Sequence, residues 1–266
     1  MAFIPTLVCA QTTTDQNANP NRMVVRLSHP SQPARIRMQM LNSNVNVRGY
    51  SGNEVIIEGA VVGDRTRNDS VPEEARGMRR LTKPAGLRAD EDDNVVTIHT
   101  GFGNESLDLQ VPASSVVSLK TFTGKIRVEG VLGELDLEST NGDITLDQVG
   151  GSIVAHALNG GVTANVVRLD ANKPSSFSTL NGRIDVTMPA SIHANLNMRS
   201  DQGDIYLDQG FDFKLLATSS GSGSKSESDG MIKLRMDNTI HGAINGGGAE
   251  INIRSFNGSI LVHKGK

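Results

Sequence analysis

Histidine and carboxylate side chains are the residues of this sequence that could do chemistry. No histidine has a second histidine or a cysteine at metal-ligand spacing. No G-x-S-x-G nucleophile elbow or phosphate-binding loop is present, and no lysine follows the glycine-rich stretch INGGGAE. We therefore expect no catalytic residue, no metal site and no cofactor, and interpret the histidines as solvated loop or strand residues: His29, His99, His156, His193, His241 and His263.

Aspartates could supply the acid–base pair of a β-helical enzyme that cleaves polysaccharides. The candidates are Asp136, Asp143, Asp147, Asp185, Asp204 and Asp208. Such a pair needs one carboxyl group that burial or a like charge keeps protonated, and nothing in the sequence indicates this. Alternating charges at Lys125, Asp143, Arg183 and Asp204 instead suggest surface ion pairs between neighbouring repeats. If glycans were cleaved, Asp143 and Asp185 would be a pair to test.

The composition excludes nucleic-acid binding and a membrane-spanning helix. The 266 residues carry 26 Lys and Arg against 29 Asp and Glu, so there is no basic footprint for nucleic acid. Aromatic residues make up 3% of the chain and tryptophan is absent, which leaves few stacking platforms for bases or sugars. No run approaches the 18 apolar residues of a membrane-spanning helix.

The first ten residues resemble the end of a secretion signal. A short apolar stretch ends in Val8-Cys9-Ala10, which suits cleavage before Gln11. A lipid anchor on Cys9, the single cysteine, is an alternative, although Val8 is bulky for the residue before a lipidated cysteine. We expect residues 1–10 to be the remnant of an export signal and residues 11–23 to be a flexible segment, which places the protein in the periplasm, at the cell surface or outside the cell.

A repeated phrase dominates the rest of the chain. Turn glycines at 124, 142, 160, 182 and 203 are spaced by 18, 18, 22 and 21 residues, and Gly258 carries a further copy. The residues at positions −7, −5, +2 and +4 from each glycine are apolar, with Ser175 the one exception. They are Val117, Leu119, Ile126 and Val128; Leu135, Leu137, Ile144 and Leu146; Ile153, Ala155, Val162 and Ala164; Ser175, Phe177, Ile184 and Val186; Leu196, Met198, Ile205 and Leu207; and Ile251, Ile253, Ile260 and Val262.

Polar residues between these positions give a period of two, which is typical of strands with one buried face. Two short strands and two turns account for a repeat of 18 to 22 residues, and a second turn recurs at Gly133 and Gly151. We therefore predict an all-β fold, a single-domain parallel β-solenoid whose stacked coils share one core. Ile144, Ile184 and Ile205 should stack in one buried column. An antiparallel meander, with every Asn-Gly in a hairpin, is the alternative.

The residue before most of the turn glycines is asparagine, at Asn141, Asn159, Asn181 and Asn257. Asparagine tolerates left-handed backbone, and stacked amides can also form a hydrogen-bonded ladder. The sequence does not separate these two explanations. A weaker seventh copy, with Ile36, Met38, Val45 and Val47, surrounds Ser43.

Two stretches interrupt the repeat and are predicted to be inserted loops. Residues 63–94 are highly charged and could hold a short helix near Glu73–Arg80, and residues 217–230 have the composition of a linker. The predicted solenoid domain spans residues 24–266 with these two insertions. The charged end HKGK is expected to protect the last open strand edge.

Three phrases resemble a known bacterial family, the "putative adhesin" domain of unknown function. The stretch beginning LDLQVPASS joins a strand ending in Val111-Pro112 to serial turn phrases, and IDVTMPASIHANLNMRSDQGDIYLD repeats that order. INGGGAEINIRSFNGSILVHKGK is similar to the family's usual ending. The resemblance covers residues 24–266 and implies a repetitive all-β envelope protein with an adhesive or scaffolding role. The family offers no catalytic residue.

We therefore expect a non-catalytic, exported envelope protein whose partner is an envelope protein or a glycan, with neither nucleic acid nor a transmembrane segment in the mature chain. A sensory or regulatory envelope partner is the main alternative, and a polysaccharide-active enzyme is a third possibility. Ligand and oligomeric state are not readable from the sequence.

Overall fold

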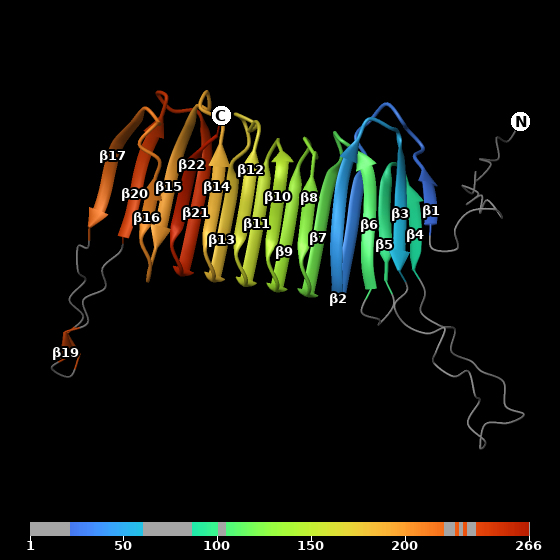
Figure 1. Cartoon of the computed structure of the whole chain (residues 1–266), viewed down its shortest axis with the longest axis horizontal. Coiled ribbons are helices and arrows are strands. Elements are labelled where there is room, and N and C mark those ends of the chain that lie inside the picture. Colours follow the sequence, from blue (N-terminus) through green and yellow to red (C-terminus); the bar gives the residue numbers. More distant parts are fainter. Residues whose placement is uncertain are drawn as a thin grey trace, which may run out of the picture.

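The computed structural model describes residues 22–60, 87–100, 105–220, 227–228, 231–232 and 238–265. Within these residues the chain is all-β and forms no helix. Its strands lie in two long sheets, A and B, that face each other along an elongated stack (Figure 1). A separate small pair joins β18 (Glu227–Ser228) to β19 (Met231–Ile232).

Each sheet has a definite order of hydrogen-bonded strands, starting at the end of the stack that holds β1. Sheet A runs β1 (Arg22–Arg26), β3 (Glu54–Ala60), β6 (Glu105–Pro112), the second half of β2 (Arg35–Tyr50), β8 (Ile126–Glu129), β10 (Ile144–Val149), β12 (Val162–Val166), β14 (Ile184–Met188), β22 (Ile260–Lys264) and β16 (Ile205–Leu207). Sheet B runs β4 (Arg88–Asp92), β5 (Val95–His99), the first half of β2, β7 (Val116–Thr123), β9 (Leu135–Asn141), β11 (Ile153–Asn159), β13 (Ser175–Asn181), β21 (Ala249–Asn257), β15 (Ala194–Ser200), β20 (Asn238–Ile244) and β17 (Phe213–Ser220).

The central strands pair in parallel, which confirms the β-solenoid and rules out the antiparallel meander. Equivalent residues of successive coils are direct partners, so that Ile126, Ile144, Val162 and Ile184 follow one another across sheet A. Within the described residues of sheets A and B, antiparallel pairs occur only towards the two ends, with β1, β3 and β4 at one end and β20 and β17 at the other.

The core lies between the sheets and consists of the residues that the repeat predicted. Side chains at positions +2 and +4 are at most 1% exposed in every copy except that of Gly203, where Ile205 and Leu207 are half-buried, and the seventh copy around Ser43 contributes fully to the core. Ser175, the one polar exception, is also buried, and its hydroxyl accepts a hydrogen bond from the backbone of Ile153. Stacking therefore provides a continuous apolar interior that no single coil could form.

The recurring glycines are required by close contact between coils. A Cβ atom at Gly142 would overlap the carbonyl oxygen of Gly124, and the same overlap recurs at Gly160, Gly182, Gly258 and Gly203 with the glycine of the neighbouring coil. Gly124, Gly142 and Gly258 also have a positive φ. The Asn-Gly phrase thus marks a tightly stacked corner of the solenoid, whereas a hairpin would need antiparallel neighbours.

The asparagines beside these glycines form a hydrogen-bonded ladder. Asn159 donates to Asn141 at 3.0 Å, Asn181 donates to Asn159 at 2.8 Å, and Asn257 donates to Asn181 at 2.7 Å. None of these four residues has a positive φ, so the explanation from left-handed backbone is wrong for them. The amide ladder explains why asparagine recurs.

The order of coils departs from the order of the sequence near both ends. The C-terminal strands β21 and β22 lie between the coil of β13 and β14 and the coil of β15 and β16 (Figure 1). Likewise, β2 lies between β5 and β7 in sheet B and between β6 and β8 in sheet A. The expected column is therefore Ile144, Val162, Ile184, Ile260 and Ile205, with Ile205 only half-buried.

This order corrects two expectations about particular residues. The end HKGK does not protect an open edge, because β22 pairs with β14 on one side and β16 on the other. Arg183 and Asp204 are not on adjacent coils, because the coil of Ser259 separates them. Lys125 and Asp143, which are on adjacent coils, do form the expected ion pair at 3.5 Å.

The borders of the predicted segments differ from those of the strands. β4 lies inside residues 63–94, and β17 continues to Ser220, inside residues 217–230. β1 begins at Arg22, within the segment 11–23 that was expected to be flexible. The predicted export signal with Cys9, and the helix suggested near Glu73–Arg80, lie outside the described residues.

Candidate functional site

Each of the six histidines has a polar neighbour. His156 lies 2.8 Å from the Ser178 hydroxyl, and His263 lies 3.4 Å from the Asp185 carboxylate. The other four lie near Asp93, Asp90, the Asn245 carbonyl and the Asn197 amide, in the order His29, His99, His193 and His241. Within the described residues, no group of three or more His, Cys, Asp or Glu side chains could hold a metal ion.

The candidate pair Asp143 and Asp185 is held by different contacts. Asp143 pairs with Lys125 and accepts a hydrogen bond from the backbone of Gly161 at 3.0 Å. Asp185 lies 3.4 Å from His263 and 3.9 Å from an Arg183 nitrogen. Asp143 lies in the corner before β10, at repeat position +1, whereas Asp185 lies on β14 at position +3, and neither contributes to the groove described below.

The remaining four aspartates each make contacts of their own. Asp136, Asp147 and Asp204 accept hydrogen bonds from Ser118, Asn165 and Tyr206, respectively. Backbone hydrogen bonds from Gly210 and Lys264 lower the pKa of the Asp208 carboxyl group. None of these contacts joins two of the six aspartates, so the structure does not assemble them into one site.

The outer face of sheet B carries a different feature, an exposed apolar column at repeat position −2. Strand register places the six residues of the apolar column side by side from β2 to β21. Leu41 and Phe122 are each 55% exposed, and Leu180 and Phe256 are each 40% exposed. Such residues gain nothing from the core and enlarge the apolar surface in contact with water. The apolar column comprises Leu41, Phe122, Leu158, Leu180 and Phe256 with the polar Thr140 between Phe122 and Leu158, and both Thr140 and Leu158 are only partly exposed.

Position −2 could have been found in the sequence. Four of the six glycine-aligned copies carry Phe or Leu there, against the polar residues expected on a solvated face. The repeat, however, is defined by the positions that point inward. An apolar residue next to the turn is therefore difficult to distinguish, in the sequence, from the inward-facing apolar residues of the same strand.

A row of polar side chains runs beside the apolar column, two residues earlier on each strand. Lys120 and Glu138 form an ion pair at 2.8 Å, and His156 and Ser178 follow on the next two strands. The hydrogen bond from Lys120 lowers the pKa of the Glu138 carboxyl group, and the same bond raises the pKa of the Lys120 ammonium group. Both groups therefore stay charged over a wide pH range. The polar row comprises Gln39, Lys120, Glu138, His156, Ser178 and Arg254.

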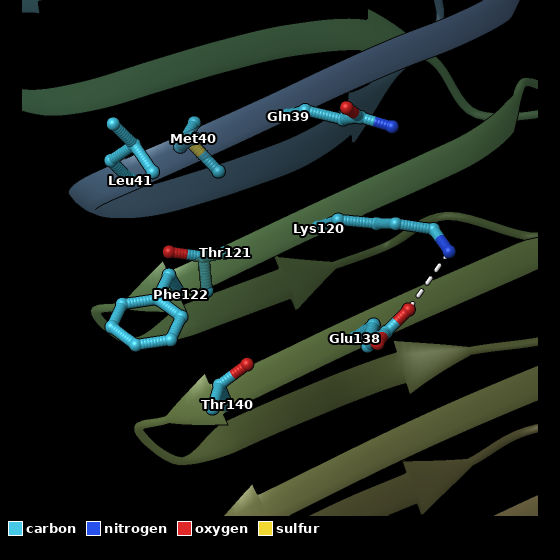
Figure 2. A pocket seen from close by; sticks show the side chains of 8 residues that line it. All are labelled: Gln39, Met40, Leu41, Lys120, Thr121, Phe122, Glu138 and Thr140. Atoms are coloured by element: carbon cyan, nitrogen blue, oxygen red, sulfur yellow. Dashed lines mark hydrogen bonds and ion pairs between the residues drawn. The ribbon is translucent and has the colours of Figure 1, made fainter. Parts of the chain in front are cut away.

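An open groove of about 440 Å³ lies between the apolar column and the polar row across β2, β7 and β9 (Figure 2). Leu41 and Phe122 lie along one side, and the Lys120–Glu138 ion pair lies along the other. An aromatic face next to charged donors and acceptors suits a ligand with both apolar and hydroxyl-bearing surfaces. The lining residues are Gln39, Met40, Leu41, Lys120, Thr121, Phe122, Glu138 and Thr140.

The sequence matches a family model over most of its length. The model described as Toastrack DUF4097 matches residues 31–245. The chain belongs to this family. The match confirms the family resemblance seen in the repeated turn phrases.

Other comparisons add little to the family assignment. A crystal structure of a "putative cell adhesion protein" from Clostridium sporogenes ATCC 15579 matches with a TM-score of 0.41 and 11% identity, covering 93% of this chain and 100% of that one. No curated protein matches the sequence. Within the described part of this Toastrack chain, no helix is long and apolar enough to cross a membrane.

Proposed function

We propose that this Toastrack protein is a non-catalytic, exported envelope module that adheres or scaffolds through the outer face of sheet B. The apolar column and the polar row carry the proposal, because they continue side by side over six coils. At a strand spacing of about 4.8 Å they extend for about 24 Å. That length suits an extended polymer or a flat protein surface better than a small molecule enclosed in a pocket.

The proposed ligand is a glycan or an envelope protein. The groove beside Phe122 offers an apolar ring for one face of a sugar, with the Lys120–Glu138 pair in reach of hydroxyl groups. Aromatic side chains with polar side chains around them are also typical of protein–protein interfaces. Export is part of the proposal and is supported by the Val8-Cys9-Ala10 pattern.

A binding assay with matched variants tests this function. The full-length protein is incubated with the envelope fraction of its host and with a panel of bacterial and plant polysaccharides. Phe122→Ser with Leu180→Ser should abolish binding, because both side chains are exposed and belong to the apolar column. The control Thr163→Ser lies on the outer face of sheet A and should bind like the wild type.

The alternatives give different results in the same experiment. Release of reducing ends, lost in Asp143→Ala with Asp185→Ala, would replace the proposal with glycan cleavage. Capture of a single envelope protein and no glycan would favour the regulatory-partner function on the same face. Equal binding by the wild type and the Phe122–Leu180 variant would show that the apolar column is not the binding surface.

A further inference from the structure

The two sheets end unevenly at the end of the stack that holds β16. Sheet A stops there, and β22 is the one strand paired with β16 in the described residues, whereas sheet B continues with β20 and β17 (Figure 1). Ile205 and Leu207 on β16 are half-buried, although the same positions in the other coils are at most 1% exposed. In the described residues, the backbone N–H and C=O groups on the outer edge of β16 therefore have no strand partner, and part of the core beside Ile205 and Leu207 is open.

The opposite end of sheet A has a free edge at β1. In the described residues, β1 pairs with β3 alone, and its sequence RMVVR places a charge at each end. Met23 and Val25 lie opposite the buried Ile57 and Val55, so they point inward. By alternation, Arg22, Val24 and Arg26 point outward. Arg22 and Arg26 each pair with one glutamate of β3, which leaves other N–H donors of each guanidinium unused by those ion pairs.

The sequence of the β16 edge complements that of β1. Residues 204–208 read DIYLD, with the three polar or aromatic side chains pointing outward and the two apolar ones inward. Placed in register, the outward pairs are Arg22 with Asp204, Val24 with Tyr206 and Arg26 with Asp208. The inward pairs are Met23 with Ile205 and Val25 with Leu207. Charges would therefore be opposite at both ends of the pairing, and apolar residues would meet at every inner position.

We propose that β16 accepts strand β1 of a second copy of this chain, so that copies join head to tail through sheet A. The strand directions permit this by simple translation along the stack. β1 is antiparallel to β3, and β3 is antiparallel to β6, so β1 runs parallel to the coils. The added β1 and β3 would lie against the overhanging part of sheet B that begins with β20, and would bury the open end of the core.

Sheet B constrains how the joint forms. β4 precedes β5 at the other end of the stack, so β4 of the second copy would reach the place that β17 occupies. β4 of the second copy and β17 cannot both occupy this place, so one of them must be displaced. β17 is the more weakly held, because its register breaks between Leu215 and Ala217, and Leu215 and Leu216 are 54% and 60% exposed. The proposed joint therefore displaces β17 from β20 in favour of β4.

Cross-linking tests the register of the joint. In full-length protein with Cys9→Ser, Val24→Cys on one chain should react with Tyr206→Cys on another through a short bis-maleimide, because in-register neighbours lie about 5 Å apart. Val24→Cys with Thr163→Cys is the control, since Thr163 is outward at the same repeat position but lies on an interior strand. A dimer yield no higher than in this control would overturn the proposal.

Sedimentation of charge-reversal variants tests the head-to-tail polarity. Wild-type protein should associate as its concentration rises, whereas Arg22→Glu with Arg26→Glu, and Asp204→Lys with Asp208→Lys, should each stay monomeric while keeping the wild-type circular dichroism. A mixture of the two variants should associate again, because each supplies one intact end. Wild-type protein that stays monomeric at all concentrations, or a mixture that does not associate, would contradict the joint. Neither result depends on whether the outer face of sheet B binds a glycan.

Discussion

At the scale of single residues, the close stacking of the coils depends on the Cβ atom that glycine lacks as well as on the side chains that form contacts. Each turn glycine lets the carbonyl oxygen of the neighbouring coil approach to a distance that no Cβ atom would allow. The asparagine before it then hydrogen-bonds to the asparagines of adjacent coils. The two residues therefore have separate roles. Glycine permits the short distance between coils, and asparagine forms the side-chain hydrogen bonds that link neighbouring coils.

Gly160→Ala should destabilise the protein by about 3 kcal/mol or more, because the new methyl group would overlap a backbone oxygen that cannot move independently. Chemical denaturation measures the loss. Gly161→Ala is the matched control: its Cβ would lie 3.1 Å from the Arg183 carbonyl oxygen, a tight but tolerable contact, so its cost should be clearly smaller. Equal costs at the two positions would mean that close stacking is not the reason for the repeated glycine.

The ion pair of Glu138 should make the stability of the folded protein depend on pH in a defined direction. Its folded-state pKa is lowered by the hydrogen bond from Lys120, so its contribution to stability is present above the unfolded-state pKa and is lost as the pH falls through the folded-state pKa. Glu138→Gln should therefore have a lower Tm than the wild type at neutral pH, by a small amount because the pair is exposed. The difference should disappear in acid, and a difference that persists there would assign it to packing.

At the scale of the element, the sequence predicted most strands because each coil repeats the same alternation. The inward positions, the parallel pairing and the corner ladder all follow from local pattern and spacing. The order of coils does not, because the coil of Gly258 and the coil of Gly203 carry the same apolar pattern and either could pair with the coil of Gly182. In the structure, the coil of Gly258 pairs with the coil of Gly182, so that β21 and β22 lie inside the stack. The apolar column was missed since outward residues are not constrained by the core.

Position within the stack should determine the cost of truncating equivalent side chains. Ile184 is fully buried between Val162 and Ile260, so Ile184→Ala should cost roughly 2–5 kcal/mol. Ile205 occupies the same repeat position but is half-buried on the edge strand, so Ile205→Ala should cost markedly less in dilute, monomeric protein. Urea denaturation of both variants compares the two directly. A larger cost at Ile205 would place the weak end of the core elsewhere.

At the scale of the whole molecule, strands distant in sequence are interleaved near both ends of the stack. β2 separates the coil of β5 and β6 from that of β7 and β8, and the last coil of the sequence separates two earlier coils. In an ordinary solenoid a terminal repeat contacts one neighbour and can be lost with a local cost. In this chain the C-terminal coil contacts a neighbour on each side, so its loss affects both.

Removing residues 249–266 should therefore do more than shorten the stack. β15 and β16 would lose their parallel partners, and β13 and β14 would be left as a new open edge. We expect residues 194–244 to become sensitive to protease and the β-sheet signal in circular dichroism to fall by more than the deleted strands contribute. Deletion of residues 1–26 is the control, because it removes β1, an edge strand with one partner in the described chain, and should leave the rest resistant. A C-terminal deletion variant in which residues 194–244 stay protected would mean that β15 and β16 close the gap by pairing directly with β13 and β14, and that the interleaved coil is dispensable for stability.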